Sequence, residues 1–261
     1  MFMKEIQAVM TIAYRDFTKL LRDKFRMAGS LVFPLIFVGV LGGGLNSSLA
    51  GRLPFAYMPF IFVGIFAQTM FQSAAAGVIS LIQDRENDFS KELFVAPVSR
   101  YSIIFGKILG ESLVAMTQGV GIILLGLLFG VPLTFAKLFM MIPLALLSAI
   151  LGGAFGILIV ASASEQRTAN QFFPFLIFPQ LFLSGVFSPV QDFPTILYYL
   201  SYLTPIRYVV DLMRSLYYAG TPEYDAVIAN SPVFNIFIIL LLLVTFLIAG
   251  TLLFIRKEKN R

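Results

Sequence analysis

Residues 84–107 read DRENDFSKELFVAPVSRYSIIFGK and form the longest charged interruption between two apolar runs of membrane-spanning length. Its eight charged side chains exclude it from hydrocarbon, whereas Phe89, Leu93 and Ala96 recur at helical spacing. Pro97 would end such a helix at the preceding residue, and Ser99 can cap the next one. The pattern predicts a short helix over residues 86–98, outside the membrane between two spans.

Composition sets the class of protein. The chain has 261 residues, of which 58% are hydrophobic and 13% charged. Its several long apolar runs leave no stretch that could form a soluble core, so we expect a single all-α polytopic membrane domain over residues 1–261. The chain contains no Cys and no His, which removes disulfides, thiolate nucleophiles and histidine bases or metal ligands.

The apolar runs predict six membrane spans, joined by short segments. The spans cover residues 30–50, 54–82, 101–129, 138–163, 169–187 and 233–255. The glycines at 152, 153 and 156 predict close helix packing in the fourth span, and Pro174 and Pro179 predict a bend in the fifth.

Residues 4–27, before the first span, predict an amphipathic helix. Ile6, Met10, Ala13, Phe17 and Leu20 follow one stripe, with basic residues opposite. A basic polar face next to a span favours a helix lying in the inner headgroup layer. A surface helix anchored only by its neighbours is the alternative.

The distribution of basic residues indicates the orientation. With both termini inside, 15 Lys and Arg residues lie on the cytoplasmic side and four outside. The positive-inside rule therefore predicts cytoplasmic termini and a cytosolic 84–107 stretch.

Residues 188–220, between the last two spans, predict short outer helices. One short helix would cover residues 194–203, and another would begin at Pro205. The second carries Arg207, Asp211 and Arg214 at spacings of four and three, so the carboxylate could pair with either guanidinium. We expect helices packed partly into the outer leaflet; a solvated loop is the alternative.

Glu111 is the one carboxylate well inside a predicted span. An intramembrane acid is a candidate for a proton relay or a cation site. Lys107 lies four residues earlier on the same helix face, so the two could instead form an ion pair near the inner interface. Both readings stay open at this point.

Nucleotide chemistry is not expected of this chain. Gly106 and Lys107 lack the flanking residues of a GxxxxGK[ST] phosphate loop, and no catalytic constellation occurs elsewhere. We therefore expect a non-enzymatic protein that does not hydrolyse ATP.

Two stretches resemble the membrane subunits of ABC-2 type exporters, in particular the drug-export and nodulation-factor-export branch. RENDFSKELFVAPVSR (residues 85–100) is similar to the cytosolic segment of that family, and PQLFLSGVFSPVQDFPTILYYLSYLTPIRYVVDLMR (residues 179–214) to its signature. The matching residues of the signature are Phe182, Leu183, Ser184, Gly185, Phe187, Pro189, Pro194, Pro205, Tyr208, Asp211 and Arg214. Ser188 and Phe193 depart from the commonest pattern, and the polysaccharide-exporting branch fits less well because this chain has no Trp.

The resemblance implies a permease in a prokaryotic cell membrane, with a second identical or paralogous permease copy and two ATPase subunits that hold ATP and Mg. The permease itself would bind no cofactor and no nucleic acid, but would contact membrane lipids. The resemblance assigns ATPase coupling to Glu86, Asp88, Phe89, Glu92, Leu93, Pro97 and Arg100. It assigns outer-gate or structural roles to Pro189, Pro194, Pro205, Arg207, Tyr208, Asp211 and Arg214.

The expected function is ATP-driven export of an amphipathic or lipid-linked substrate, such as a drug, lipid or glycolipid. An interior poor in charge suits this mechanism, since ATP supplies the work. The alternative is an ion-coupled secondary transporter that uses Glu111, which would require an inverted repeat between the two halves. No convincing similarity relates the first three predicted spans to the last three.

Overall fold

A computed structural model describes residues 2–86, 99–163 and 165–259, and the regular elements of these residues are all helices. The first half contains α1 (Phe2–Arg22), α2 (Lys24–Ser30), α3 (Val32–Pro34), the π-helix η1 (Leu35–Gly42), α4 (Gly43–Leu49), α5 (Tyr57–Val78), α6 (Ser80–Glu86) and α8 (Arg100–Leu128). The second half contains α9 (Phe135–Ser162), α10 (Gln166–Leu183), the 3₁₀-helix η2 (Val190–Asp192), α11 (Thr195–Ser201), α12 (Pro205–Tyr217), α13 (Tyr224–Val227) and α14 (Pro232–Lys259).

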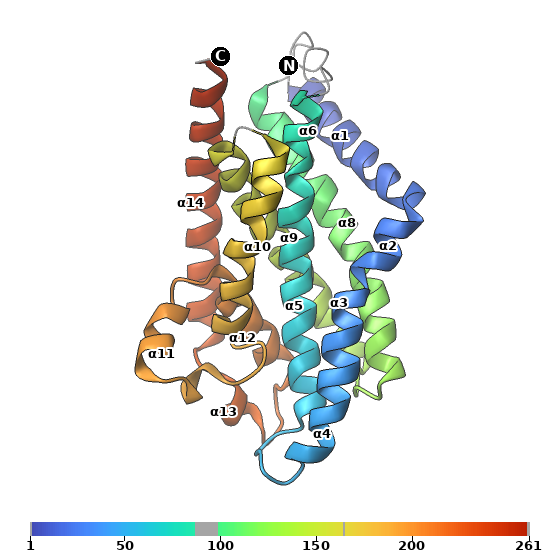
Figure 1. Ribbon diagram of the computed structural model, residues 1–261, viewed down its shortest axis with the longest axis vertical. Coiled ribbons are helices and arrows are strands. Elements are labelled where there is room, and N and C mark those ends of the chain that lie inside the picture. The colour runs from blue at the N-terminus through green and yellow to red at the C-terminus, as the bar shows by residue number, and fades with distance from the viewer. Residues whose placement is uncertain (1, 87–98, 164, 260–261) are drawn as a thin grey trace.

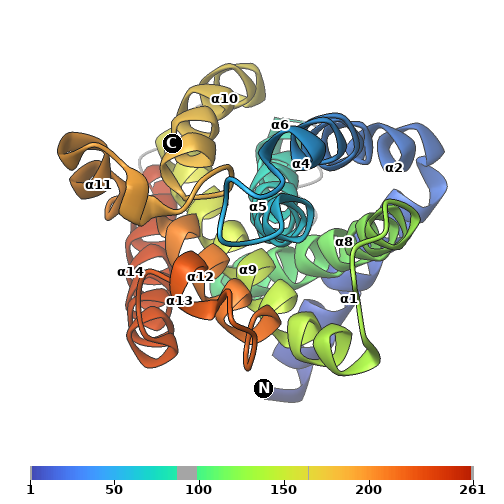
Figure 2. The ribbon, with the colours of Figure 1, turned by 90° about the horizontal axis from the view of Figure 1, so that it is seen from below.

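The α5 helix is the centre of the bundle. It is apolar around its whole circumference, so it is buried on almost every side, as Phe60, Ile65 and Met70 illustrate. The α8, α9 and α12 helices surround it, and the α2–α4 segment lies outside α5 and α8 (Figures 1 and 2). The core is therefore built by helices packed on a central apolar helix.

Glycines bring α9 into backbone contact with α5, as the sequence predicts. A methyl group built on Gly152 would lie 2.1 Å from the carbonyl oxygen of Phe71, and one on Gly156 would lie 2.6 Å from that of Ala75. Only residues without a side chain permit this approach. Ser148 adds a hydrogen bond from its Oγ to the carbonyl oxygen of Ala67, at 2.9 Å.

Five helical segments of the described chain are long and apolar enough to cross a membrane. They are Met27–Leu49, Tyr57–Ile82, Arg100–Leu128, Phe135–Ser162 and Tyr224–Arg256. The predicted fifth span, residues 169–187, does not qualify. The helix at its place, α10, has 18 residues, and its first six include Gln166, Arg167, Asn170 and Gln171. This polar first part leaves an apolar stretch too short for a full span.

The α10 helix nevertheless carries the chain from the end of the molecule near α6 toward the opposite end. The first turn of α1 and the last turn of α14 lie at the same end of the molecule as α6, and α4, α11 and α13 lie toward the other end (Figure 1). The α10 helix continues through Pro174 and Pro179 and leads from the end of α9 toward α11. The short helices η2, α11 and α12 lie within residues 188–220, where the sequence predicts short helices, and α13 follows outside that range.

The N-terminal amphipathic segment consists of two helices, with a break at Asp23. The α1 helix packs on α8 through Ile12, Ala13 and Leu20, whereas Ile6 and Met10 are exposed. The predicted apolar stripe is thus divided: one part contacts protein, and the other remains free for an apolar environment. The helix expected over residues 86–98 lies outside the described residues, apart from Glu86 at the end of α6.

Candidate functional site

The ends of α1, α6 and α8 meet beside the predicted coupling segment. Two glycines of α8 allow α1 to lie directly against it: a methyl group on Gly106 would lie 3.0 Å from Ile12 Cβ, and one on Gly110 would lie 3.0 Å from Ala13 Cα. The close approach places Asp16 of α1 in the interior, with 5% of its surface exposed. A carboxylate at that position requires a partner.

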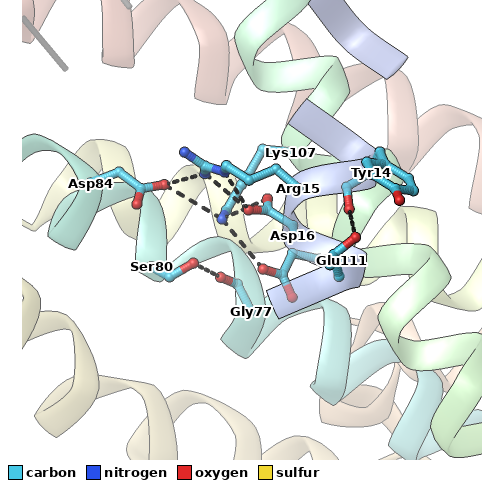
Figure 3. Close-up of polar contacts among 9 residues, drawn as sticks. Tyr14, Arg15, Asp16, Gly77, Ser80, Asp84, Lys107 and Glu111 are labelled. Atoms are coloured by element: carbon cyan, nitrogen blue, oxygen red, sulfur yellow. Dashed lines mark hydrogen bonds and ion pairs between the residues drawn. The ribbon is translucent and has the colours of Figure 1, made fainter. Parts of the chain in front are cut away.

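Five charged residues form a cluster at this junction (Figure 3). The charged cluster consists of Arg15, Asp16, Asp84, Lys107 and Glu111. Lys107 Nζ lies 2.8 Å from Asp16 Oδ2, 3.4 Å from Glu111 Oε1 and 3.7 Å from Asp84 Oδ2. Arg15 Nη2 lies 2.9 Å from Asp16 Oδ1 and 2.7 Å from Asp84 Oδ2. The two cations thus join α1, α6 and α8 through three carboxylates.

Burial makes these contacts stronger than surface ion pairs. Lys107, Asp16 and Glu111 are almost fully buried, and Asp84 and Arg15 lie at the more exposed edge of the charged cluster. With every group ionised, three acids and two bases leave a net charge of −1. Removing one partner of a buried pair leaves an uncompensated charge, so the five residues depend on each other.

Glu111 occupies a space that a glycine provides. A methyl group on Gly77 of α5 would lie 1.9 Å from Glu111 Oε2. The ion pair between Lys107 and Glu111 that the sequence suggests is present. The sequence reading missed Asp16 and Asp84 as further partners of Lys107, because they come from other segments. Asp16 gives one local signal: it interrupts the buried face formed by Ala13 and Leu20.

The start of α8 is held by α1 as well. Ser99 caps α8, since its Oγ accepts from the backbone N–H of Ser102 at 3.1 Å, as predicted. Glu5 adds a contact that sequence reasoning missed: its carboxylate accepts from the Ser99 N–H at 3.1 Å and from the Ser102 hydroxyl at 2.5 Å. The carboxylate lies at the positive end of the α8 dipole, which favours its charged form.

The predicted coupling residues are described only in part. Glu86 ends α6, and Arg100 is the first residue of α8. Asp88, Phe89, Glu92, Leu93 and Pro97 lie outside the described residues. The charged cluster therefore joins the helix that precedes the predicted coupling segment, α6, to the helix that follows it, α8.

The predicted outer residues form a second polar site, on α12. Arg214 is buried and donates to three backbone carbonyl oxygens: Gly185 at 2.7 Å, Val186 at 3.0 Å and Phe60 at 3.2 Å. Its guanidinium lies over the Phe60 ring, 3.5 Å from the centroid. Arg214 thus joins the segment after α10 to the first turn of α5.

Arg207 and Tyr208 bind the preceding short helix. Arg207 donates to the Ser201 hydroxyl, and its guanidinium lies 3.9 Å from the centroid of the Tyr202 ring. The Tyr208 hydroxyl donates to the Tyr202 carbonyl oxygen at 2.9 Å. Pro189 and Pro194 immediately precede η2 and α11, and Pro205 is the first residue of α12, as its fixed φ favours.

Asp211 does not pair with either guanidinium, contrary to what its spacing suggests. Its carboxylate accepts from the backbone N–H groups of Ala229 and Asn230 and from Asn235 Nδ2, each at 2.8 Å. Two of these donors lie in the loop before α14 and the third in the first turn of α14, while Arg207 and Arg214 donate to carbonyl oxygens and a hydroxyl elsewhere. Spacing along one helix could not reveal partners on another segment.

Comparison with known proteins assigns this architecture to a family. A profile of the ABC-2 type transporter family matches residues 7–218. The chain belongs to the ABC-2 type transporter family. The matched range contains the charged cluster and the α12 site.

Relatives of this ABC-2 family member are named as permeases. The putative transport permease ycf38 of Cyanophora paradoxa is 28% identical over 262 residues, which cover 98% of this chain and 90% of the relative. The inner membrane transport permease YadH of Escherichia coli K12 is 28% identical over 186 residues, covering 70% of this chain and 72% of the relative. The probable multidrug ABC transporter permease YbhR of the same strain is 28% identical over 140 residues, covering 53% of this chain and 38% of the relative.

Family membership confirms the expected role as a non-catalytic, multipass membrane permease. The ABC-2 family also implies an ATPase partner, because the permease does not itself supply ATP hydrolysis.

Proposed function

We propose that the chain is the membrane-spanning subunit of an ATP-driven exporter for amphipathic or lipid-linked substrates. Two permease copies, identical or paralogous, would combine with two ATPase subunits that hold ATP and Mg. The observation that carries this proposal is the charged cluster, which joins α1, α6 and α8 on both sides of the predicted coupling segment. A movement of that segment would be transmitted to three helices at once.

In this proposal, the end of the molecule that contains α6 and both termini faces the cytoplasm of a prokaryotic cell, and α10 completes a sixth crossing. The excess of Lys and Arg at that end supports the orientation. The α11–α13 helices would then lie in the outer leaflet, with the α12 site holding the outer end of the path. The exposed Ile6 and Met10 of α1 would contact the inner headgroup layer.

The ion-coupled alternative is not favoured. Glu111 would have to exchange ions with a pathway, yet its carboxylate is buried, contacts Lys107 and packs on Gly77 of the central helix. It serves as one member of a structural charge network.

The test of docking is co-purification with an ATPase encoded nearby. We expect Phe89→Asp and Leu93→Asp to abolish the association, since each places a charge on the predicted apolar face of the coupling helix. Thr221→Asp, near the opposite end of the molecule, is the control and should leave the association unchanged. Retained association and normal ATPase activity in both coupling variants would contradict the proposal.

A further inference from the structure

The corner between α1 and α2 projects from the side of the bundle (Figures 1 and 2). The two helices break at Asp23, and the first candidate membrane span begins at Met27, four residues later. The corner therefore lies at the border of the membrane, where the chain meets the polar head groups of lipids. Its side chains decide which head groups fit.

An exposed apolar stripe leads along α1 to this corner. It recurs at helical spacing and has at least 46% of each side chain's residue surface exposed, at Met3, Ile6, Met10, Tyr14 and Leu21. Phe25 adds an apolar side chain beyond the corner, with 92% of its surface exposed. The α8 helix packs on another face of α1, through Ile12 and Leu20, and leaves this stripe uncovered. A contiguous exposed apolar surface of this kind marks a contact with lipid or with another molecule.

Cations gather beside the end of the apolar stripe. Residues 19–26 contain four basic residues and one acidic residue. Lys19, Arg22 and Lys24 are exposed, and none of the three forms an ion pair with a residue that the structure describes. Arg22 lies roughly 100° around the helix from Leu21, so a lipid whose tails follow the stripe can bring its phosphate to Arg22.

An anionic lipid surface fits this combination better than an acidic protein does. A soluble acidic partner would pair with Arg22 and Lys24 but would leave the fully projecting Phe25 in water. A phospholipid satisfies both kinds of group, because its acyl chains contact the apolar side chains while its head group meets the cations. Each Lys or Arg near an anionic surface strengthens binding by roughly fivefold, and a zwitterionic surface offers no such gain.

We propose that the α1–α2 corner binds anionic phospholipids in preference to zwitterionic ones. Because Arg15 and Asp16 of α1 belong to the charged cluster, a lipid that holds α1 in place also supports the helix that joins α6 and α8. The inference deepens the proposed function, because it names a lipid partner of the permease at the end where the ATPase would bind. Its placement in the cytoplasmic leaflet rests on that function, whereas the binding itself requires neither ATP nor a partner protein.

The chain contains no Trp, so Phe25→Trp places a single fluorophore at the corner. The full chain is reconstituted in phosphatidylcholine nanodiscs that contain increasing fractions of brominated phosphatidylglycerol or brominated phosphatidylcholine. Bromine quenches Trp on contact, so the two curves give the local lipid preference. We expect phosphatidylglycerol to be preferred by about tenfold, and brominated phosphatidylserine likewise, because the charge is recognised. Phe237→Trp is the control reporter and should show no preference: it is exposed on α14, with charged residues at least 12 positions away along the chain.

Variants connect the preference to the cations. Added to the reporter, Arg22→Gln/Lys24→Gln should reduce it to about twofold or less. Arg52→Gln/Arg167→Gln removes the same charge from exposed positions elsewhere and should leave it unchanged. Raising the salt concentration from about 0.1 M to about 1 M should abolish it, because the Debye length falls from about 10 Å to about 3 Å. Inorganic phosphate in place of chloride, at constant ionic strength, should not compete, which separates a lipid head group from free phosphate.

Equal quenching by phosphatidylglycerol and phosphatidylcholine, a preference that survives in Arg22→Gln/Lys24→Gln, or the same preference at Phe237→Trp would overturn the inference. So would loss of ATPase association in Arg22→Gln/Lys24→Gln with the lipid preference intact, because the cations would then bind the partner protein. ATP-driven transport without a lipid preference at the corner would leave the proposed function standing and remove this site alone. A lipid preference without ATP-driven transport would do the reverse.

Discussion

At the scale of single residues, glycines determine which charged groups can meet. Gly106 and Gly110 admit α1 to the surface of α8, and Gly77 leaves room for the Glu111 carboxylate. The charged cluster forms only because these three positions lack a side chain. The charged cluster thus depends on three glycines that themselves have no polar or charged side chain.

Gly77→Ala should destabilise the protein by about 1–3 kcal/mol, because the added methyl group displaces Glu111 from Lys107. Gly152→Ala should be more harmful, since the methyl group meets the Phe71 backbone, which cannot move aside. Gly44→Ala is the control, with nothing within 4 Å of the new methyl group. Thermal denaturation in detergent should show the largest loss of stability for Gly152→Ala, a smaller loss for Gly77→Ala and none for Gly44→Ala. Equal stability of Gly77→Ala and Gly44→Ala would contradict the close packing of Glu111.

Lys107→Met should cost about 3–5 kcal/mol, because it leaves three carboxylates with Arg15 alone. The loss should be partly relieved in the double variant Lys107→Met/Glu111→Gln, which removes one acid as well. Lys19→Met, on an exposed part of α1, should be neutral. Denaturation midpoints of the wild type, the single variants Lys107→Met and Glu111→Gln, the double variant and the control measure the effect. Simple additivity in the double variant would argue against a coupled network.

At the scale of elements, Glu5 of α1 is hydrogen-bonded to the N-terminal end of α8. The Ser102 hydroxyl and the Ser99 N–H both donate to the Glu5 carboxylate and lower its pKa. A lowered pKa means that the folded state favours the ionised form. Its stabilising effect is therefore present above the pKa of the unfolded chain and is lost as the pH falls through the folded value.

Between about pH 7 and about pH 3, the wild type should consequently lose more thermal stability than Glu5→Gln, which has no carboxyl group to protonate. Parallel melting curves across this pH range are the measurement. If the two proteins lost stability equally, the contact of the Glu5 carboxylate with the start of α8 would not contribute to the stability of the protein.

The α12 helix connects α5, the end of α10 and the segment before α14. Arg214→Met should reduce stability by about 3 kcal/mol or more, because three buried carbonyl oxygens lose their donor. Arg52→Met is the control, because Arg52 lies exposed in the loop before α5. The yield of folded protein and the denaturation midpoint test the difference. A stable Arg214→Met variant would contradict the role of α12 as an anchor.

The sequence predicted those features that depend on neighbouring residues and missed those that depend on residues far apart in the chain. Apolar run length and proline placement are local, so the membrane helices, the Ser99 cap and the start of α12 at Pro205 were predictable. The Lys107–Glu111 pair was predictable too, but the partners of Asp211 and the partners of Lys107 on α1 and α6 were not, because they are 18 or more residues away along the chain. The predicted fifth span, residues 169–187, extends beyond the apolar part of the helix found there, because α10 begins with mostly polar residues and ends at Leu183.

At the scale of the whole molecule, polarity is divided between two ends. The charged cluster lies toward the end with both termini, and the α12 site lies toward the other (Figure 1). The apolar α5 connects them and packs on Glu111 through Gly77 and on Arg214 through Phe60. In the proposed function, α5 would connect an ATPase subunit bound at the end with both termini to a substrate path at the other end.

The central claim is that ATP hydrolysis by a separate subunit drives transport through this chain. The most direct measurement uses proteoliposomes that contain the chain with an ATPase encoded nearby, and follows a panel of fluorescent lipids, glycolipids and drugs. We expect at least one probe to move with ATP, to stop with a non-hydrolysable analogue, and to ignore a protonophore. Proton-gradient-driven movement by the chain without any ATPase, lost in Glu111→Gln, would contradict the account.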